Sequence, residues 1–206
     1  AEITLDGFND DAKIEIQRSG RGVVYVASQL VSYTRSTLAA GKDNGFKVTR
    51  HYQIQNEKGK WRDVIGAIPS GVRVRVDLRV EVTRPYQYLL LEDYVPSGFE
   101  ARPEDDSLAQ QIERKCDCGT DELVVVDPPP GWNQLPVSRR EGRDNRQAWF
   151  VDYLPYNPDY QNGKYYLRYI LRPEQPGTRV APPARIEAMY RPDFNGHSSE
   201  TPIEVK

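Results

Sequence analysis

Hydrophobic and polar residues alternate with a period of two along much of this chain. In the stretch VRVRVDLRVEV, residues 72–82, every even position is Val or Leu and every odd position is charged. Successive side chains of a β-strand point to opposite faces, so this pattern predicts a strand with one buried face and one exposed face. We therefore expect the charged residues at the odd positions to form a solvated face.

Other segments carry the same strand pattern. Runs rich in Val, Ile, Tyr and Phe are separated by clusters of Gly, Pro, Asn and Asp, which are typical of tight turns between antiparallel strands. The runs are KIEIQ (13–17), VVYVASQLVSYT (23–34), FKVTRHYQIQ (46–55), YQYLLLEDYV (86–95), QAWFVDYL (147–154), KYYLRYIL (164–171) and TPIEVK (201–206). The sequence therefore predicts an all-β fold, an antiparallel β-sandwich.

A long polar insert, residues 102–140, interrupts the predicted strands. Within it, DDSLAQQIERKC (105–116) predicts one short helix, because Ser107 can cap it and apolar residues recur at a spacing of four. These apolar positions are Leu108, Ile112 and Cys116. Long connections inside a β-unit are usually functional or poorly ordered.

The alternation stops in STLAAGKDNG, residues 36–45, which is rich in Gly and Ala. We interpret this segment as the connection between a two-stranded piece, residues 1–36, and a larger sandwich, residues 37–206. A single hairpin cannot bury its own apolar face, so the first piece needs a packing partner. Since no signal peptide is visible and the chain begins in a strand-like stretch, we expect a fragment of a longer protein.

Charge and composition argue against two classes of partner. The chain carries 28 Lys and Arg against 30 Asp and Glu, a formal net charge of −2. This balance provides no basic footprint for nucleic acid or for an anionic membrane surface. The apolar runs are only a few residues long, which is too short for membrane insertion.

Candidate catalytic and metal-binding residues are few. His51 and His197 each lack a second ligand or base at close spacing, whereas general-base catalysis needs a positioned partner. Cys116 and Cys118 in CDCG supply at most half of a structural zinc site, which takes about four ligands. The sequence therefore predicts a non-catalytic domain without a cofactor.

Aromatic residues in loops suggest one possible function. Tyr156 and Tyr160 lie in the polar loop LPYNPDYQNG, outside the alternating segments. Their rings either form a contact surface or pack over the edge of the sandwich. One hypothesis is therefore a free-standing adhesion or carbohydrate-binding module, in which Trp132 joins the two tyrosines as a platform for a sugar.

Three longer motifs connect the chain to a known family. They are YLLLEDYVPSGFEA (88–101), REGRDNRQAWFVDYLP (140–155) and YYLRYILRPEQPGTRVAPPARIEAMYRPD (165–193). In this order they resemble the C-terminal macroglobulin-like domain of bacterial alpha-2-macroglobulins, which in animal relatives becomes a receptor-binding domain. The segment IEIQRSGRGVVYVASQLVSY (14–33) resembles the closing hairpin of the CUB-like domain that precedes it in that family.

The resemblance implies a role in a large protease trap of the periplasm or cell envelope. In this family a protease cuts a bait region, the molecule rearranges, and an internal thioester in another domain bonds the attacker. The C-terminal domain packs against the thioester domain in the resting state. The thioester motif C-x-E-Q is absent from this chain. The implied partners are thus the other domains of the parent chain and, through the full-length protein, target proteases.

Four residues of these motifs are candidate structural or interaction residues. Asp144 and Arg146 in RDNR are predicted to clasp the end of the insert, with Asp144 accepting from arginines or backbone N–H groups. Met189 and Tyr190 are predicted to anchor the final strand, with the Tyr190 ring in the core and its hydroxyl on a backbone acceptor. The rival hypothesis places Tyr190 on the surface, where it contacts the thioester domain.

Overall fold

The computed structural model divides the chain into two compact units, Ala1–Arg35 and Ser36–Lys206. The residues that it describes are 15–26, 38–57, 59–103, 112–117, 120–125, 129–159 and 162–206. Residues 15–26 of the first unit contain a bend at 20–22 and no strand. The assignment of residues 1–36 to a CUB-like domain stays a prediction.

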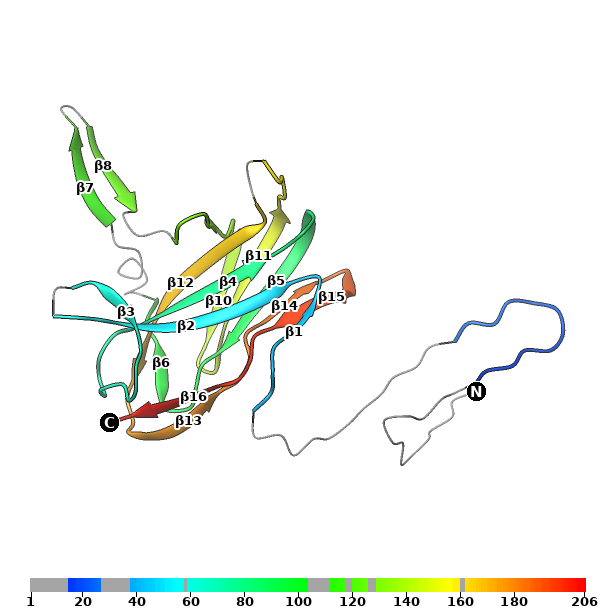
Figure 1. Cartoon of the computed structure of the whole chain (residues 1–206), viewed down its shortest axis with the longest axis horizontal. Helices are drawn as coiled ribbons and strands as arrows, with labels where there is room; N and C mark the ends of the chain where they lie inside the picture. The colour runs from blue at the N-terminus through cyan, green and yellow to red at the C-terminus, as the bar shows by residue number, and fades with distance from the viewer. Residues whose placement is uncertain are drawn as a thin grey trace. The chain divides into compact units, whose positions relative to one another are not determined.

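The second unit contains two large antiparallel sheets that face each other (Figure 1). Sheet A has six strands in the order β1-β15-β14-β5-β11-β10. Their bounds are β1 Lys42–Asn44, β5 Tyr86–Tyr94, β10 Arg139–Arg143, β11 Arg146–Leu154, β14 Arg185–Ala188 and β15 Arg191–His197. Strand β5 lies in the middle of the order, where it pairs with β14 on one side and with β11 on the other.

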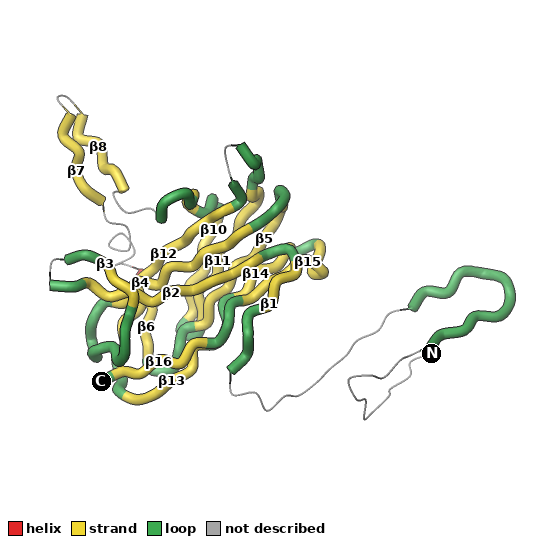
Figure 2. The backbone as a smooth tube through the Cα atoms, in the orientation of Figure 1, coloured by secondary structure: helices red, strands yellow, loops and turns green. Residues whose placement is uncertain are grey.

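Sheet B has the order β3-β2-β4-β12-β6, and β9 runs parallel to β12. Its bounds are β2 Lys47–Gln55, β3 Trp61–Asp63, β4 Val74–Glu81, β6 Phe99–Ala101, β9 Asn133–Gln134 and β12 Lys164–Pro173. Two further pairs are β13 (Gly177–Ala181) with β16 (Thr201–Val205), and β7 (Ile112–Asp117) with β8 (Thr120–Val125). Figure 2 shows the strands of the two sheets as two layers. The predicted all-β sandwich is confirmed.

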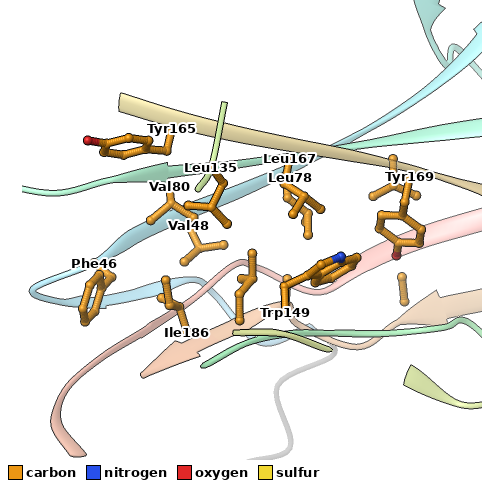
Figure 3. Packing of buried hydrophobic residues seen from close by; sticks show 14 of the residues in the cluster. Phe46, Val48, Leu78, Val80, Leu135, Trp149, Tyr165, Leu167, Tyr169 and Ile186 are labelled. Carbon is orange, nitrogen blue, oxygen red and sulfur yellow. The ribbon is translucent and has the colours of Figure 1, made fainter. Parts of the chain in front are cut away.

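One hydrophobic core fills the space between the two sheets (Figure 3). The even positions of β4 supply aliphatic residues from sheet B, with Val74, Val76 and Leu78 fully buried. Sheet A contributes side chains such as Trp149, whose ring lies 5.2 Å from that of Tyr169 on β12. The alternating pattern therefore identified the inward face of β4 correctly.

The opposite face of β4 is less solvated than its charges predict. Arg75 and Asp77 are 2% and 0% exposed. The Arg75 guanidinium stacks over Trp61 at 4.8 Å, and Asp77 accepts a hydrogen bond from Arg168 at 3.4 Å. Because β4 lies between β2 and β12, long neighbouring side chains cover its charged positions. The prediction of a solvated face was wrong for these two residues.

The helix predicted for residues 105–116 is wrong at its C-terminal end. Residues Ile112–Asp117 form strand β7, which pairs with β8 from Ile112 opposite Val125 to Asp117 opposite Thr120. A spacing of four residues is also a multiple of two, so the apolar positions that suggested a helix fit one face of a strand equally well. Residues 104–111 and Cys118 lie outside the described residues.

Candidate functional site

Met189 and Tyr190 form the exposed tip of the β14–β15 hairpin. Ala188 pairs with Arg191, so Met189 and Tyr190, which lie between them, make the reverse turn that joins the strands. The Tyr190 side chain is 77% exposed and Met189 is 44% exposed, whereas Ile186 in the same hairpin is 1% exposed. The prediction that Tyr190 anchors the core was therefore wrong. The aliphatic residue of β14 reaches the core, and the turn places the next two side chains outside.

Two further tyrosines are exposed on the neighbouring strands of sheet A. Tyr88 on β5 is 50% exposed and Tyr153 on β11 is 51% exposed. The Tyr88 ring contacts the Tyr190 ring edge to face, with centroids 5.3 Å apart and planes at 87°. The backbone N–H of Met189 also donates to the Tyr88 carbonyl oxygen at 2.9 Å. We call Tyr88, Tyr153, Met189 and Tyr190 the aromatic tip.

The backbone at Tyr88 explains why two consecutive side chains of β5 face outward. Among the described residues other than glycine, Tyr88 alone has a positive φ, at +53°. Tyr86 and Leu89 are both buried, so the alternation slips by one residue and leaves Gln87 and Tyr88 exposed. A left-handed conformation at a bulky residue costs free energy and is found preferentially at functional sites. The strain therefore marks the aromatic tip as a candidate site.

A hollow of about 490 Å³ lies beside the aromatic tip. Its walls are mainly aromatic, and two arginines join them. The lining residues are Arg84, Pro85, Tyr86, Gln87, Tyr88, Tyr153, Ala188, Tyr190, Arg191 and Phe194. They come from the β4–β5 connection, β5, β11 and the β14–β15 hairpin, which are far apart in the sequence. Sequence patterns could not bring them together, because only the pairing of β5 with β11 and β14 does so.

A second unusual feature is a charged cluster inside the core. Arg50 on β2 and Asp93 on β5 form an ion pair at 2.5 Å, with side chains 1% and 0% exposed. The Tyr169 hydroxyl on β12 donates to the second carboxylate oxygen of Asp93 at 2.8 Å. Arg50 also donates to the Ala181 carbonyl oxygen at 3.2 Å. The cluster therefore connects sheet B to sheet A through the middle of the sandwich.

Burial controls the electrostatics of this cluster. Loss of hydration raises the pKa of the Asp93 carboxyl above its ordinary value, although Arg50 and Tyr169 act in the opposite direction. Burial also raises the pKa values of Tyr52 and Tyr169, so both phenols stay protonated at neutral pH. Both phenols are enclosed in the core beside the Arg50–Asp93 ion pair, so the cluster is suited to connecting the sheets.

Asp144 and Arg146 differ in their surroundings. Asp144 is an exposed residue of the two-residue turn between β10 and β11, where Arg143 pairs with Arg146. Arg146 forms an ion pair with Glu92 of β5 at 2.6 Å. Asp144 therefore has the exposure of an ordinary surface residue, and only Arg146 makes a cross-strand contact.

The residues of the hypothetical sugar platform are not exposed together. Tyr156 is half-buried and packs against the core. Trp132 is also half-buried, with the Arg79 and Lys164 cations 5.4 and 5.9 Å from its ring. Tyr160 lies outside the described residues. For Tyr156 the packing interpretation is therefore the better one.

The described residues contain neither a metal-binding cluster nor a membrane-spanning helix. Within the ranges given above, no three side chains of His, Cys, Asp and Glu lie close enough together to hold a metal ion. His197 contacts the Ser198 carbonyl oxygen through Nδ1 at 3.0 Å. In the same parts of the chain, no helix is long and apolar enough to cross a membrane.

Comparison with known proteins gives a family match over most of the second unit. The family described as "Bacterial Alpha-2-macroglobulin MG10 domain" matches residues 45–193. The match contains β5, β11 and the β14–β15 turn, and therefore the whole aromatic tip. The motifs that suggested this family from sequence lie largely in the same range.

Individual relatives are much longer than this chain. An alpha-2-macroglobulin homolog of Nostoc sp. is 24% identical over an alignment of 203 positions, which covers 94% of this chain and 9% of the relative. The native conformation of Escherichia coli alpha-2-macroglobulin is 22% identical with a TM-score of 0.61, covering 84% of this chain and 10% of that one. Trypsin-activated alpha-2-macroglobulin from the same organism is 20% identical with a TM-score of 0.55, covering 82% and 11%.

Proposed function

Since the chain belongs to the bacterial alpha-2-macroglobulin MG10 domain family, we propose that it is a non-catalytic docking domain of a protease inhibitor. In this proposal the aromatic tip packs against the thioester domain of the parent protein and keeps it in the resting state. The observation that carries the proposal is the exposure of Met189 and Tyr190 at 44% and 77%. The four large side chains of the aromatic tip are clustered at one end of sheet A. The exposed apolar residues of an ordinary protein surface are scattered singly.

Two further observations support a docking role. The strained backbone at Tyr88 holds its ring against Tyr190, so the tip is ordered before a partner arrives. Preorganised aromatic residues with few rotatable bonds lose little entropy on binding and are enriched at interaction hot spots. One relative is a trypsin-activated alpha-2-macroglobulin, which supports proteases as targets of the parent protein. The periplasm or cell envelope is the proposed location, on the basis of the family.

The experiment compares Tyr190→Ala in this chain with Tyr190→Ala in the full-length parent. We expect the isolated chain to keep its melting temperature. In the parent, we expect the thioester to react faster with methylamine before any protease is added, because its cover is gone. Ile65→Ala is the matched control, since Ile65 is 96% exposed and lies away from the tip on the segment after β3.

The two outcomes separate the docking role from the alternatives. Equal methylamine reactivity of wild type and Tyr190→Ala in the parent would show that the tip does not cover the thioester.

A free-standing carbohydrate-binding module is the second hypothesis from sequence. Its expected aromatic platform, with Tyr156 and Trp132 half-buried, has no support in the described structure.

A further inference from the structure

The hollow beside the aromatic tip carries positive charge in addition to its aromatic walls. Among the described residues that line it, Arg84 and Arg191 are the charged ones, and none is a carboxylate. The Arg84 guanidinium lies 4.0 Å from the centroid of the Phe194 ring, and that of Arg191 lies 4.6 Å from the same centroid. Both cations therefore lie beside the same ring.

Arg84 is held in place by the rigid part of the fold. Its Nε donates to the Tyr86 hydroxyl at 3.1 Å, and its guanidinium lies 5.2 Å from the Tyr86 ring. Tyr86 is 7% exposed and packs on Phe46 with ring centroids 4.3 Å apart. Among the residues that the structure describes, no carboxylate lies within ion-pair distance of Arg84. Its terminal N–H groups therefore remain available to a ligand at a fixed position.

Arg191 has one acidic neighbour, but this neighbour is a weak partner. The Arg191 Nη2 atom lies 3.2 Å from Asp193 Oδ2, and the two side chains are 65% and 62% exposed. Ion pairs this exposed contribute little, because water screens them. A carboxylate entering the hollow can instead accept two N–H bonds from a guanidinium in the planar geometry that arginine favours.

We propose that the hollow receives an Asp or Glu side chain of the parent protein, next to an apolar residue that packs on the aromatic tip. This inference rests on the proposed function and adds the chemistry of the docking segment. Charge complementarity carries the argument, since the described lining of the hollow includes two arginines and no acidic residue. This chain covers only 9% and 10% of two matched relatives, so the rest of such a parent is long enough to supply this segment.

Other occupants fit the same surface less well. An inorganic anion would contact the arginines but would leave the tyrosine and phenylalanine walls without a partner. A second copy of this chain, docked by two-fold symmetry, would bring its own arginines against Arg84 and Arg191, so like charges would face each other. An acidic residue beside an aromatic residue satisfies both parts of the hollow.

The test uses two blocked tetrapeptides as probes, Gly-Asp-Phe-Gly and its neutral counterpart Gly-Asn-Phe-Gly. NMR titration of this chain should show that the aspartate peptide binds about fivefold more tightly, and that added salt removes the preference. Arg84→Gln should abolish the preference. Arg62→Gln, an exposed arginine on edge strand β3, is the matched control and should keep it. Equal affinities, no binding of either peptide, or a preference that survives in Arg84→Gln would overturn the proposal.

A second measurement separates this inference from the proposed function. Hydrogen exchange at residues 188–191 should be slower in the full-length parent than in this chain, and Arg84→Gln in the parent should restore fast exchange. If exchange in the parent is slow and stays slow in Arg84→Gln, the docking role holds and the proposal that a carboxylate enters the hollow is wrong. If exchange in the parent is as fast as in this chain while the aspartate peptide is still preferred, the proposed docking role is wrong. The carboxylate that binds the hollow then does not come from the parent protein.

Discussion

The charged cluster in the core and the aromatic tip depart from the usual distribution of side chains in opposite directions. Arg50 and Asp93 are charged and enclosed, with side chains 1% and 0% exposed. Tyr190 is aromatic and 77% exposed. Buried charged groups and exposed apolar groups are the two observations that ordinary sorting by hydrophobicity does not explain.

The difference lies in where each region finds its partners. The charges of the cluster are compensated within the fold, because Asp93 contacts both Arg50 and Tyr169. The aromatic tip contacts itself through the Tyr88–Tyr190 pair, but much of its area still faces water. Mutations in the cluster should therefore reduce the free energy of unfolding, whereas mutations in the tip should affect docking in the parent.

The largest expected effect is that of Asp93→Ala. It leaves the Arg50 cation buried without its carboxylate, which typically costs about 3–5 kcal/mol in the free energy of unfolding. Urea denaturation of this chain measures the loss. The double variant Arg50→Met with Asp93→Leu should recover part of it, because it removes both charges together. A loss below about 1 kcal/mol for Asp93→Ala would show that the ion pair behaves like one on the surface.

A smaller loss is expected for Tyr169→Phe. This change removes one hydroxyl and leaves the buried Asp93 carboxylate with one donor fewer, which costs about 1–3 kcal/mol. Tyr153→Phe is the matched control: its side chain is 51% exposed, and the same change there should stay within about 0.5 kcal/mol. Equal results for the two variants would mean that the Tyr169 hydroxyl does not stabilise the cluster.

The pH dependence of stability should also report on Asp93. Its pKa is raised by burial above the ordinary value of 3.8, so the folded chain binds this proton more tightly than the unfolded chain. The contribution of Asp93 is therefore fully present below pH 3.8 and declines as the pH rises through the folded pKa. The free energy of unfolding of wild type minus that of Asp93→Asn should fall over this range in urea titrations. A difference that rises with pH would reverse the assigned direction.

The smallest expected effect on stability is that of Tyr190→Ala in the isolated chain. An exposed turn residue with few buried contacts should change the free energy of unfolding by no more than about 0.5 kcal/mol. Ile186→Ala in the same hairpin should cost about 2–5 kcal/mol, because Ile186 is 1% exposed in the core. Similar losses for both variants would place Tyr190 back among the core residues.

Part of the fold follows directly from local patterns. The alternation in residues 72–82 predicted β4 and its inward aliphatic face, since the period of two is a property of any strand. The motifs at 88–101, 140–155 and 165–193 identified the family that the later comparison confirmed. The site was predicted less well. The selection of Met189 and Tyr190 as structural or interaction residues stays a prediction, and the predicted place of the Tyr190 ring in the core was wrong.

The sequence by itself determined that this chain forms a sandwich of antiparallel strands and that it belongs to this family. Only the tertiary structure decided which charges are buried and which aromatic rings are exposed. Arg50 and Asp93 are 43 residues apart, and Asp93 and Tyr169 are 76 apart, so no local pattern connects them. Exposure depends on which strands become neighbours, and a one-residue slip at Tyr88 or a turn at Tyr190 is enough to move a ring from the core to the surface.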